Sequence, residues 1–281
     1  MREPLETVAA STDPAAITRV PRPSHLDANL VGLRTLIRRE IARILRIWTQ
    51  TLIPPAITMT LYFVIFGKLI GSRIGSIQGD FTYMQYIVPG LVMMSIITNS
   101  YSNITSSFFG LKFSHAVEEM LVSPMSNWVI LSGYVVGAVV RGLAVGVIVL
   151  GIALFFTSLD IQHPFTTFAS VLLGAIIFSL AGFINAVYAT KFDDIALVPT
   201  FILTPLTYLG GVFYSITMLG EPWQAISRAN PILYMVNAFR YGVLGITDVN
   251  VPIAFAVMLA FVIALWIVAL HLLKRGVGLR S

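Results

Sequence analysis

The chain has 281 residues, of which 57% are hydrophobic and only 11% are charged, whereas soluble domains carry about 25% charged residues. This composition excludes an ordinary soluble domain and predicts a polytopic membrane protein. Because the sequence contains no cysteine, disulfides, thiolate metal sites and cysteine nucleophiles are excluded as well.

The N-terminal part of the chain divides into two predicted segments. Residues 1–30 are polar and rich in proline, with no apolar stretch typical of a signal peptide, and we expect a disordered cytoplasmic tail. Residues 31–48 combine a broad apolar face with an opposite face of arginines, which predicts an amphipathic interfacial helix. Glu40 interrupts the apolar face. It could pair with Arg43 or contact a partner, and the sequence leaves both open.

Apolar segments predict six membrane-spanning helices, since about 20 such residues cross a bilayer. Their approximate bounds are 49–67, 83–109, 127–157, 165–190, 195–214 and 252–273. The stretch between the last two is too polar and broken to span, and it predicts short re-entrant or interfacial helices. The predicted fold is therefore all-α: six transmembrane helices, an N-terminal interfacial helix and re-entrant outer helices before the last span.

Two polar features lie inside the predicted spans. The second span carries small polar side chains at helical spacing, which share a face turned to other helices or to water. These are Ser95, Thr98, Asn99, Ser102, Asn103 and Ser106. Arg141 is the only basic residue inside a span. A charge there is costly, so Arg141 is a candidate cavity residue, although a structural pair or snorkelling would also accommodate it.

A short polar island separates the second span from the third. It contains Glu118 and Glu119, stops at Ser123-Pro124, and holds apolar residues at helical spacing. This pattern predicts a short amphipathic helix along the membrane surface, where a soluble partner could push, and the alternative is a solvated turn.

Basic residues indicate the orientation of the chain. With both termini in the cytoplasm, most lysines and arginines fall in cytoplasmic segments, whereas Lys68, Arg73, Arg228 and Arg240 fall outside. The net charge of +5 is therefore a topology signal, and we expect no nucleic-acid partner. The same orientation places the acidic island in the cytoplasm.

Several kinds of chemistry are missing from the sequence. It has no G-x-x-x-x-G-K-[ST] phosphate loop, so any ATP must be used by another chain. The four histidines have no metal-binding spacing, and no Ser/His/Asp set would meet at one depth. We therefore expect no catalytic, cofactor-binding or metal site. The lack of a carboxylate well inside a span argues against a carrier driven by an ion gradient.

Several stretches resemble a known family. They read RIWTQTLIPPAITMTLYFVIFG, YIVPGLVMMSIITNSYSN, EEMLVSPMS, FDDIALVPTFILTPLTYLGGVFYS, NPILYMVNAFRYG and RGVGLRS. From about residue 31 to its end, the chain resembles the type-2 export class of ABC transporter permeases, as found in bacterial inner membranes. The resemblance implies a permease domain over 31–281 that pairs with a second copy and with two separate ATPase subunits, which bind ATP and Mg. It also implies a multi-pass protein of the bacterial inner membrane with both termini cytoplasmic.

The resemblance also implies roles for particular residues. It places a coupling helix at about 114–122, which contacts the ATPase. The implied contacts are Glu118, Glu119, Met120 and Leu121, with Glu40 and Arg43 of the interfacial helix. It implies an outer gate formed by Asn230, Pro231, Tyr234 and Arg240, although Asn230-Pro231 also reads as a helix cap.

The function that these expectations support is export of an amphipathic drug, a lipid or a saccharide-linked compound, using ATP hydrolysed by the partner. Possible liners of its path are Met93, Met94, Phe108, Phe109, Phe178 and Phe183, although such residues usually pack in the core. The alternatives are an ion-gradient-driven secondary transporter and a membrane scaffold that transports nothing.

Overall fold

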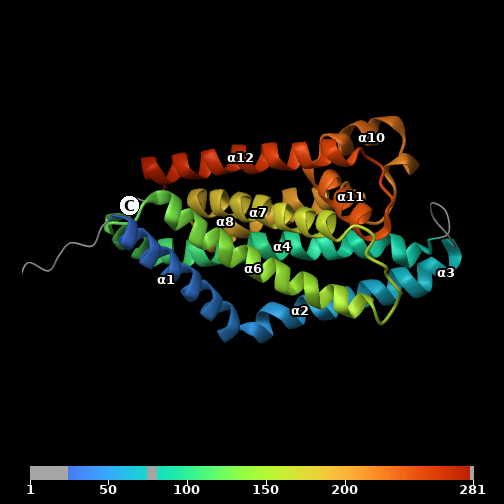
Figure 1. Ribbon diagram of the computed structural model, residues 1–281, viewed down its shortest axis with the longest axis horizontal. Coiled ribbons are helices and arrows are strands. Elements are labelled where there is room, and N and C mark those ends of the chain that lie inside the picture. The colour runs from blue at the N-terminus through green and yellow to red at the C-terminus, as the bar shows by residue number, and fades with distance from the viewer. Residues whose placement is uncertain (1–24, 75–80, 279–281) are drawn as a thin grey trace, which may run out of the picture.

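The computed structural model describes residues 25–74 and 81–278, and its elements are helices that run along one long axis (Figure 1). Most of the predicted tail, 1–24, lies outside the described residues. The helices in chain order are α1 (His25–Arg46), α2 (Trp48–Tyr62), α3 (Gly71–Ile74), α4 (Tyr83–Phe113), α5 (Ala116–Val122), α6 (Asn127–Ala153), α7 (Pro164–Tyr188), α8 (Phe192–Val198), α9 (Thr204–Tyr208), α10 (Glu221–Arg228), α11 (Pro231–Leu244) and α12 (Val251–Arg275). Two π-helices, η2 (Phe63–Ile70) and η3 (Pro199–Leu203), and a 3₁₀ turn, η4 (Ile216–Met218), complete the set.

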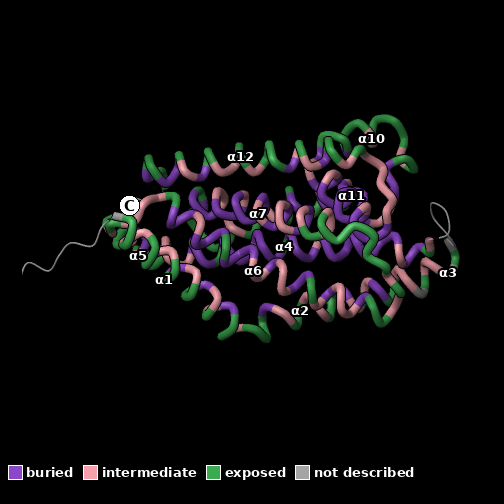
Figure 2. The backbone as a smooth tube through the Cα atoms, viewed as in Figure 1, coloured by how far each residue is buried: buried purple, intermediate pink, exposed green. Residues whose placement is uncertain are grey.

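Helix α4 is the centre of the bundle. It packs most extensively against α7 and α6, while α1 and α2 cover α6 on one side and α11 and α12 cover α7 on the other. Figure 2 shows burial concentrated on the inner helices, with the outer faces of α2 and α12 exposed. Exposed apolar faces on long helices are the pattern expected where lipid replaces water.

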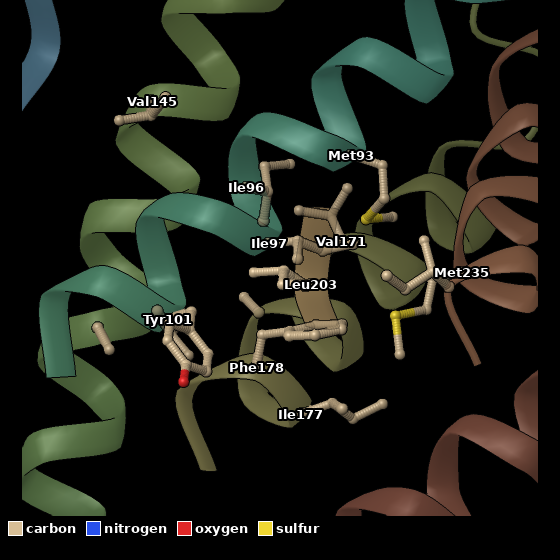
Figure 3. Packing of buried hydrophobic residues seen from close by; sticks show 14 of the residues in the cluster. Met93, Ile96, Ile97, Tyr101, Val145, Val171, Ile177, Phe178, Leu203 and Met235 are labelled. Atoms are coloured by element: carbon tan, nitrogen blue, oxygen red, sulfur yellow. The ribbon is translucent and has the colours of Figure 1, made fainter. Parts of the chain in front are cut away.

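The buried core joins α4 to its neighbours. Figure 3 shows Met93 and Ile97 of α4 beside Val171 and Phe178 of α7, with Met235 of α11 at the same level. Five of the six possible path liners, namely Met93, Phe108, Phe109, Phe178 and Phe183, are buried in this core. These side chains fill the space between neighbouring helices, as large apolar side chains do in a close-packed core, and so they do not line an open path. Met94 is the one that borders a cavity, described below.

By length and composition, four helical segments of the described residues are apolar enough to cross a membrane: Trp48–Gly67, Asn127–Ala153, Pro164–Tyr188 and Val251–Arg275. The second predicted span, α4, has 31 residues but carries the polar side chains noted above. The fifth, 195–214, is divided among α8, η3 and α9. Pro205 has no N–H to donate to the Phe201 carbonyl. One residue earlier, the Thr204 amide bonds to the Pro199 carbonyl, five residues back, in a wider π-helical turn.

Helix α1 begins at His25, six residues before the predicted start, so residues 25–30 do not belong to a tail. Asp27 lies in the first turn, where a negative charge stabilises the helix end. Asn29 accepts hydrogen bonds from the backbone and hydroxyl of Ser126, at 3.0 and 2.8 Å, which fixes this end of α1 to the start of α6. The helix breaks at Ile47, after which α2 takes a different direction (Figure 1).

Glycines allow the inner helices to approach closely. In α6, ideal Cβ atoms on Gly133 and Gly137 would lie 2.8 and 2.5 Å from the Cβ atoms of Leu36 and Glu40 of α1. In α7, a Cβ on Gly182 would lie 2.6 Å from the Tyr101 carbonyl oxygen of α4. Such close contacts are typical of membrane proteins. In lipid the hydrophobic effect does not drive helices together, and small residues allow the close packing that holds them.

Replacing Gly182 with valine is expected to destabilise the protein by about 2 kcal/mol, because the side chain meets backbone that cannot move aside. Gly151→Ala is the matched control, since a Cβ on Gly151 meets nothing within 4 Å. That control should stabilise α6 by about 0.5–1 kcal/mol. Thermal unfolding of the purified variants measures both effects. Equal melting temperatures for Gly182→Val and the wild type would contradict the close approach of α4 and α7.

Candidate functional site

Helix α5 lies at the end of the bundle where α1 begins and α12 ends. Only Ser114 and His115 separate it from α4. His115 adopts a left-handed conformation, with φ of 59°, which interrupts the helix between α4 and α5. The Ser114 amide still bonds to the Gly110 carbonyl at 3.2 Å, so the connection between α4 and α5 is held by backbone hydrogen bonding to the last turn of α4.

The four residues implied as coupling contacts divide between the two faces of α5. Glu118 and Glu119 are exposed, and Glu118 lies 3.8 Å from His115 Nδ1. Both stand in the first turn, where acidic side chains favour the helix. Met120 and Leu121 instead pack against the bundle core, and the Tyr134 hydroxyl lies 3.8 Å from Met120 Sδ. The acidic pair therefore faces outward, while the two apolar residues fix α5 to the bundle.

Two exposed apolar side chains, one at the end of α4 and one at the end of α5, were not among the expected contacts. Phe113 is 61% exposed and Val122 is 87% exposed. The Phe113 ring also packs at a tilt against Phe109 and Phe192, with ring centroids 6.1 and 5.0 Å away, which joins the end of α4 to α8. In the sequence, one of these exposed side chains precedes the acidic pair and the other follows it.

Hydrogen bonds fix the neighbouring helix ends to one another. Lys112 Nζ of α4 donates to the Val187 and Ala189 carbonyls at 2.6 Å each, closing the last turn of α7. Asp194 accepts hydrogen bonds from the Thr190 amide and hydroxyl and from the Lys191 amide, at 2.8 to 2.9 Å. These bonds, with those from Thr190 the strongest, hold the pKa of Asp194 below its usual range. The end of the bundle around α5 is thus a connected unit.

Glu40 is not at the surface. Its side chain is 1% exposed, accepts a hydrogen bond from Ser107 Oγ at 2.7 Å and pairs with Arg43 at 3.0 Å. Arg43 also donates to Asn103 Oδ1 at 2.8 Å. Of the two possibilities that the sequence left open, the internal pair is the one present, because Glu40 lies on the same stripe as the buried Leu36 and Ile44. It therefore joins α1 to α4 and is not available as a direct contact with a partner.

Replacing Glu40 with alanine is expected to lower the free energy of unfolding by about 1–3 kcal/mol, because it leaves Arg43 without its carboxylate in a largely buried place. Because Arg43 is partly exposed to solvent, which screens its charge, we expect the loss to lie toward the lower end of this range. The measurement is thermal unfolding in detergent, with Arg38→Ala on the exposed face of α1 as control. If Glu40→Ala kept the wild-type melting temperature, the buried pair would have no stabilising role.

The expected gate residues make structural contacts at the other end of the bundle. Asn230 caps α11: its Oδ1 accepts from the Ile232 amide at 3.0 Å, and Pro231 occupies the first turn. Tyr234 donates its hydroxyl to the Arg228 carbonyl at 2.8 Å. The cap reading of Asn230-Pro231 is therefore the one that the geometry supports.

Arg240 is fully buried beneath this end. Its guanidinium donates to the Gly211 carbonyl at 2.7 Å, and its Cζ lies 4.0 Å from the centre of the Tyr86 ring. Asp248 lies on the far side of Tyr86, where it accepts hydrogen bonds from the Ser215 hydroxyl at 2.7 Å and the Tyr86 hydroxyl at 3.4 Å. Arg240 thus connects α11, α4 and the turn after α9.

Arg141 points into a cavity of about 320 Å³ between α2, α4 and α6. The lining residues are Gln50, Thr51, Pro54, Pro55, Thr58, Met59, Tyr62, Met94, Ser95, Thr98, Asn99 and Arg141. Because Pro54 and Pro55 have no N–H, the carbonyls of Gln50 and Thr51 cannot receive their usual helical hydrogen bonds. These two carbonyls therefore add polar groups to the wall of the cavity that Arg141 lines.

Comparison of the sequence with known proteins shows the family to which the chain is similar. The profile described as ABC-2 type transporter matches residues 31–244. The chain is 55% identical to the inner membrane transport permease YadH of Escherichia coli K12, over 89% of this chain and 98% of that protein. The Shigella flexneri protein of the same name is equally similar. Nodulation protein J of Rhizobium leguminosarum bv. viciae is 20% identical, over 76% of this chain and 83% of that protein.

Proposed function

The chain belongs to the ABC-2 type transporter family, and on this premise we propose that it is the permease of an exporter powered by a separate ATPase subunit. As a bacterial inner-membrane transport permease it is a multi-pass membrane subunit without a catalytic site of its own. The observation that carries the proposal is α5, which presents Glu118 and Glu119 at the bundle end and is joined to α4 by two residues, Ser114 and His115.

The mechanism follows from the stiffness of that connection. Helix α4 has 31 residues and is therefore about 46 Å long. A displacement of α5 by a closing ATPase moves α4 as one element, and α4 packs against both α6 and α7. The result is a rigid-body change between two packed arrangements, which alters access to the cavity around Arg141.

We propose the following arrangement in the membrane. The six spans are α2 with η2, α4, α6, α7, the broken segment α8–η3–α9, and α12. The helices α10 and α11 form the re-entrant outer part, and both termini are cytoplasmic. Two copies of the permease pair with two ATPase subunits, which bind ATP and Mg. The exported compound is an amphipathic molecule that leaves the cytoplasm or the inner leaflet.

Affinity purification of the full chain from native membranes in mild detergent, followed by mass spectrometry, tests the proposal. We expect a stoichiometric soluble protein that contains a phosphate-binding loop and hydrolyses ATP. Repeated recovery of the well-folded chain alone would contradict the proposal. Flux driven by an ion gradient in reconstituted vesicles would then favour the secondary transporter.

A further inference from the structure

Arg141 differs from the other deeply placed arginine of this chain. Arg240 has a carbonyl at 2.7 Å, an aromatic ring beneath it and Asp248 nearby. Among the described residues, Arg141 has one long hydrogen bond, from Nη2 to Asn99 Oδ1 at 3.5 Å, and its buried Nε has no partner there. The ion pairs found among the described residues do not include Arg141.

A guanidinium in this position requires an anion or water. A charge in the middle of a membrane helix without a counter-charge is costly, and such residues face a cavity or a functional partner. The planar guanidinium fits a carboxylate or phosphate, with which it forms two parallel hydrogen bonds. Asn99 lies beside it, and the buried hydroxyl of Ser95 on the same face has no partner in the part of the chain that the structure describes. The polar side of the cavity is therefore suited to an acidic group.

The rest of the cavity is suited to an apolar chain. Pro54, Pro55 and Met59 of α2 and Met94 of α4 make its apolar wall. The cavity borders an uncovered polar stripe on α4, formed by the exposed Thr98 and Ser106 with the half-buried Ser102 between them. This stripe ends at a second cavity, of about 410 Å³, lined by residues that include Arg39, Arg43, Arg46 and Ser106. Basic side chains thus stand at both ends of one polar stripe.

We propose that the cavity around Arg141 binds the acidic head group of an amphiphile, a carboxylate or a phosphate, while the apolar chain lies against the prolines and methionines. The arginines of the second cavity attract the same head group, and the stripe on α4 leads it to Arg141. That this ligand is the exported compound rests on the proposed function, whereas its binding does not.

Binding of a dansyl-labelled fatty acid to the purified full chain, measured by fluorescence titration in a non-ionic detergent, tests the proposal. We expect Arg141→Gln to weaken binding by about tenfold to a hundredfold, the value of a hydrogen bond to a charged group. Arg141→Lys should be intermediate because lysine keeps the charge but loses the fork. Arg38→Gln makes the same change of charge on the exposed face of α1 and should bind as the wild type does.

A second variant separates loss of the site from loss of the fold. Thr98→Trp adds a large side chain at an exposed position that lines the cavity and leaves Arg141 in place. We expect it to block the probe with little change in melting temperature. Arg141→Gln should also keep its melting temperature, because it removes a charge that has no carboxylate partner.

Several outcomes would overturn the proposal. They are unchanged binding by Arg141→Gln, unchanged binding by Thr98→Trp, or equal binding of a dansyl-labelled fatty alcohol of the same length. Displacement of the probe by inorganic phosphate as readily as by phosphatidic acid would assign the site to a free anion and overturn the amphiphile. Binding that depends on Arg141 in a chain that recovers no ATPase would contradict the proposed function alone. An ATPase complex without such binding would contradict this inference alone.

Discussion

Replacing Arg240 with alanine is expected to destabilise the protein by about 3 kcal/mol or more, a large part of the 5–15 kcal/mol by which a typical domain is stable. The guanidinium is fully buried, bonds to the Gly211 carbonyl and covers the ring of Tyr86. Its removal leaves a buried carbonyl without a donor and opens a cavity between α4 and α11. Arg240→Lys keeps the charge but loses the planar fork and should lie between the two.

The measurement is the apparent melting temperature in detergent, together with the yield of monodisperse protein. Arg228→Ala, at an exposed arginine of α10 close in sequence, is the control and should change neither quantity. The gate role implied by the family resemblance makes the opposite prediction. A well-folded Arg240→Ala protein with altered transport would support a gate and contradict the structural role.

The helical period indicates the face of α1 on which Glu40 lies, although it left open whether Glu40 pairs with Arg43 or contacts a partner, whereas no pattern in the sequence indicates the burial of Arg240. Glu40 stands four residues from both Leu36 and Ile44, so the helical period already placed it on the packed face. The partners of Arg240 are a backbone carbonyl at Gly211 and the ring of Tyr86, which are far away in sequence. No period or spacing indicates contacts of that kind.

The polar face of α4 could be predicted only in part. Its side chains share one side of the helix, but the structure divides them into two stripes. Ser95, Asn99 and Asn103 are buried, whereas Thr98 and Ser106 are exposed. Which stripe is covered depends on where α6 and α1 cross α4, and a glycine on α6 such as Gly142, beside Ser100, sets that crossing. Helical spacing fixes the face but not the neighbour.

The helical period of α5 already separates its apolar residues from its acidic pair. Val117, Met120 and Leu121 stand at spacings of three and four residues, which puts them on one apolar face. The structure places that face on the bundle, and Glu118 and Glu119 on the exposed side. Grouping all four residues 118–121 as partner contacts followed from the family resemblance, whereas the period alone separates them.

The proposed coupling surface and the proposed ligand cavity belong to one element. Helix α4 carries α5 at one end, borders the arginine-lined cavity with Ser106 and reaches the Arg141 cavity with Thr98 and Asn99. Under the proposed function, a force applied to α5 would pass through Ser114 and His115 into a single helix that borders both cavities. This is why changes confined to α5 should alter transport without altering the fold.

Replacing Glu118 and Glu119 together with alanine is expected to uncouple transport from ATP hydrolysis while the protein stays folded. Both side chains are exposed and α5 is held by its apolar face, so the melting temperature should be unchanged. A contact to a charged group is worth about 1.5–3 kcal/mol, and losing two should reduce transport by about tenfold or more.

Inside-out vesicles that hold the permease with its co-purified ATPase allow the two activities to be measured on one sample. We expect ATP hydrolysis to continue while ATP-dependent uptake of the dansyl-labelled fatty acid falls. Asp193→Ala, which removes an exposed acidic residue at the same end of the bundle but outside α5, should leave uptake unchanged. Normal ATP-driven uptake by the Glu118→Ala, Glu119→Ala protein would mean that α5 does not receive the force of the ATPase through its acidic pair. In that case the exposed Phe113 and Val122, which precede and follow the pair in the sequence, would be the next contacts to test.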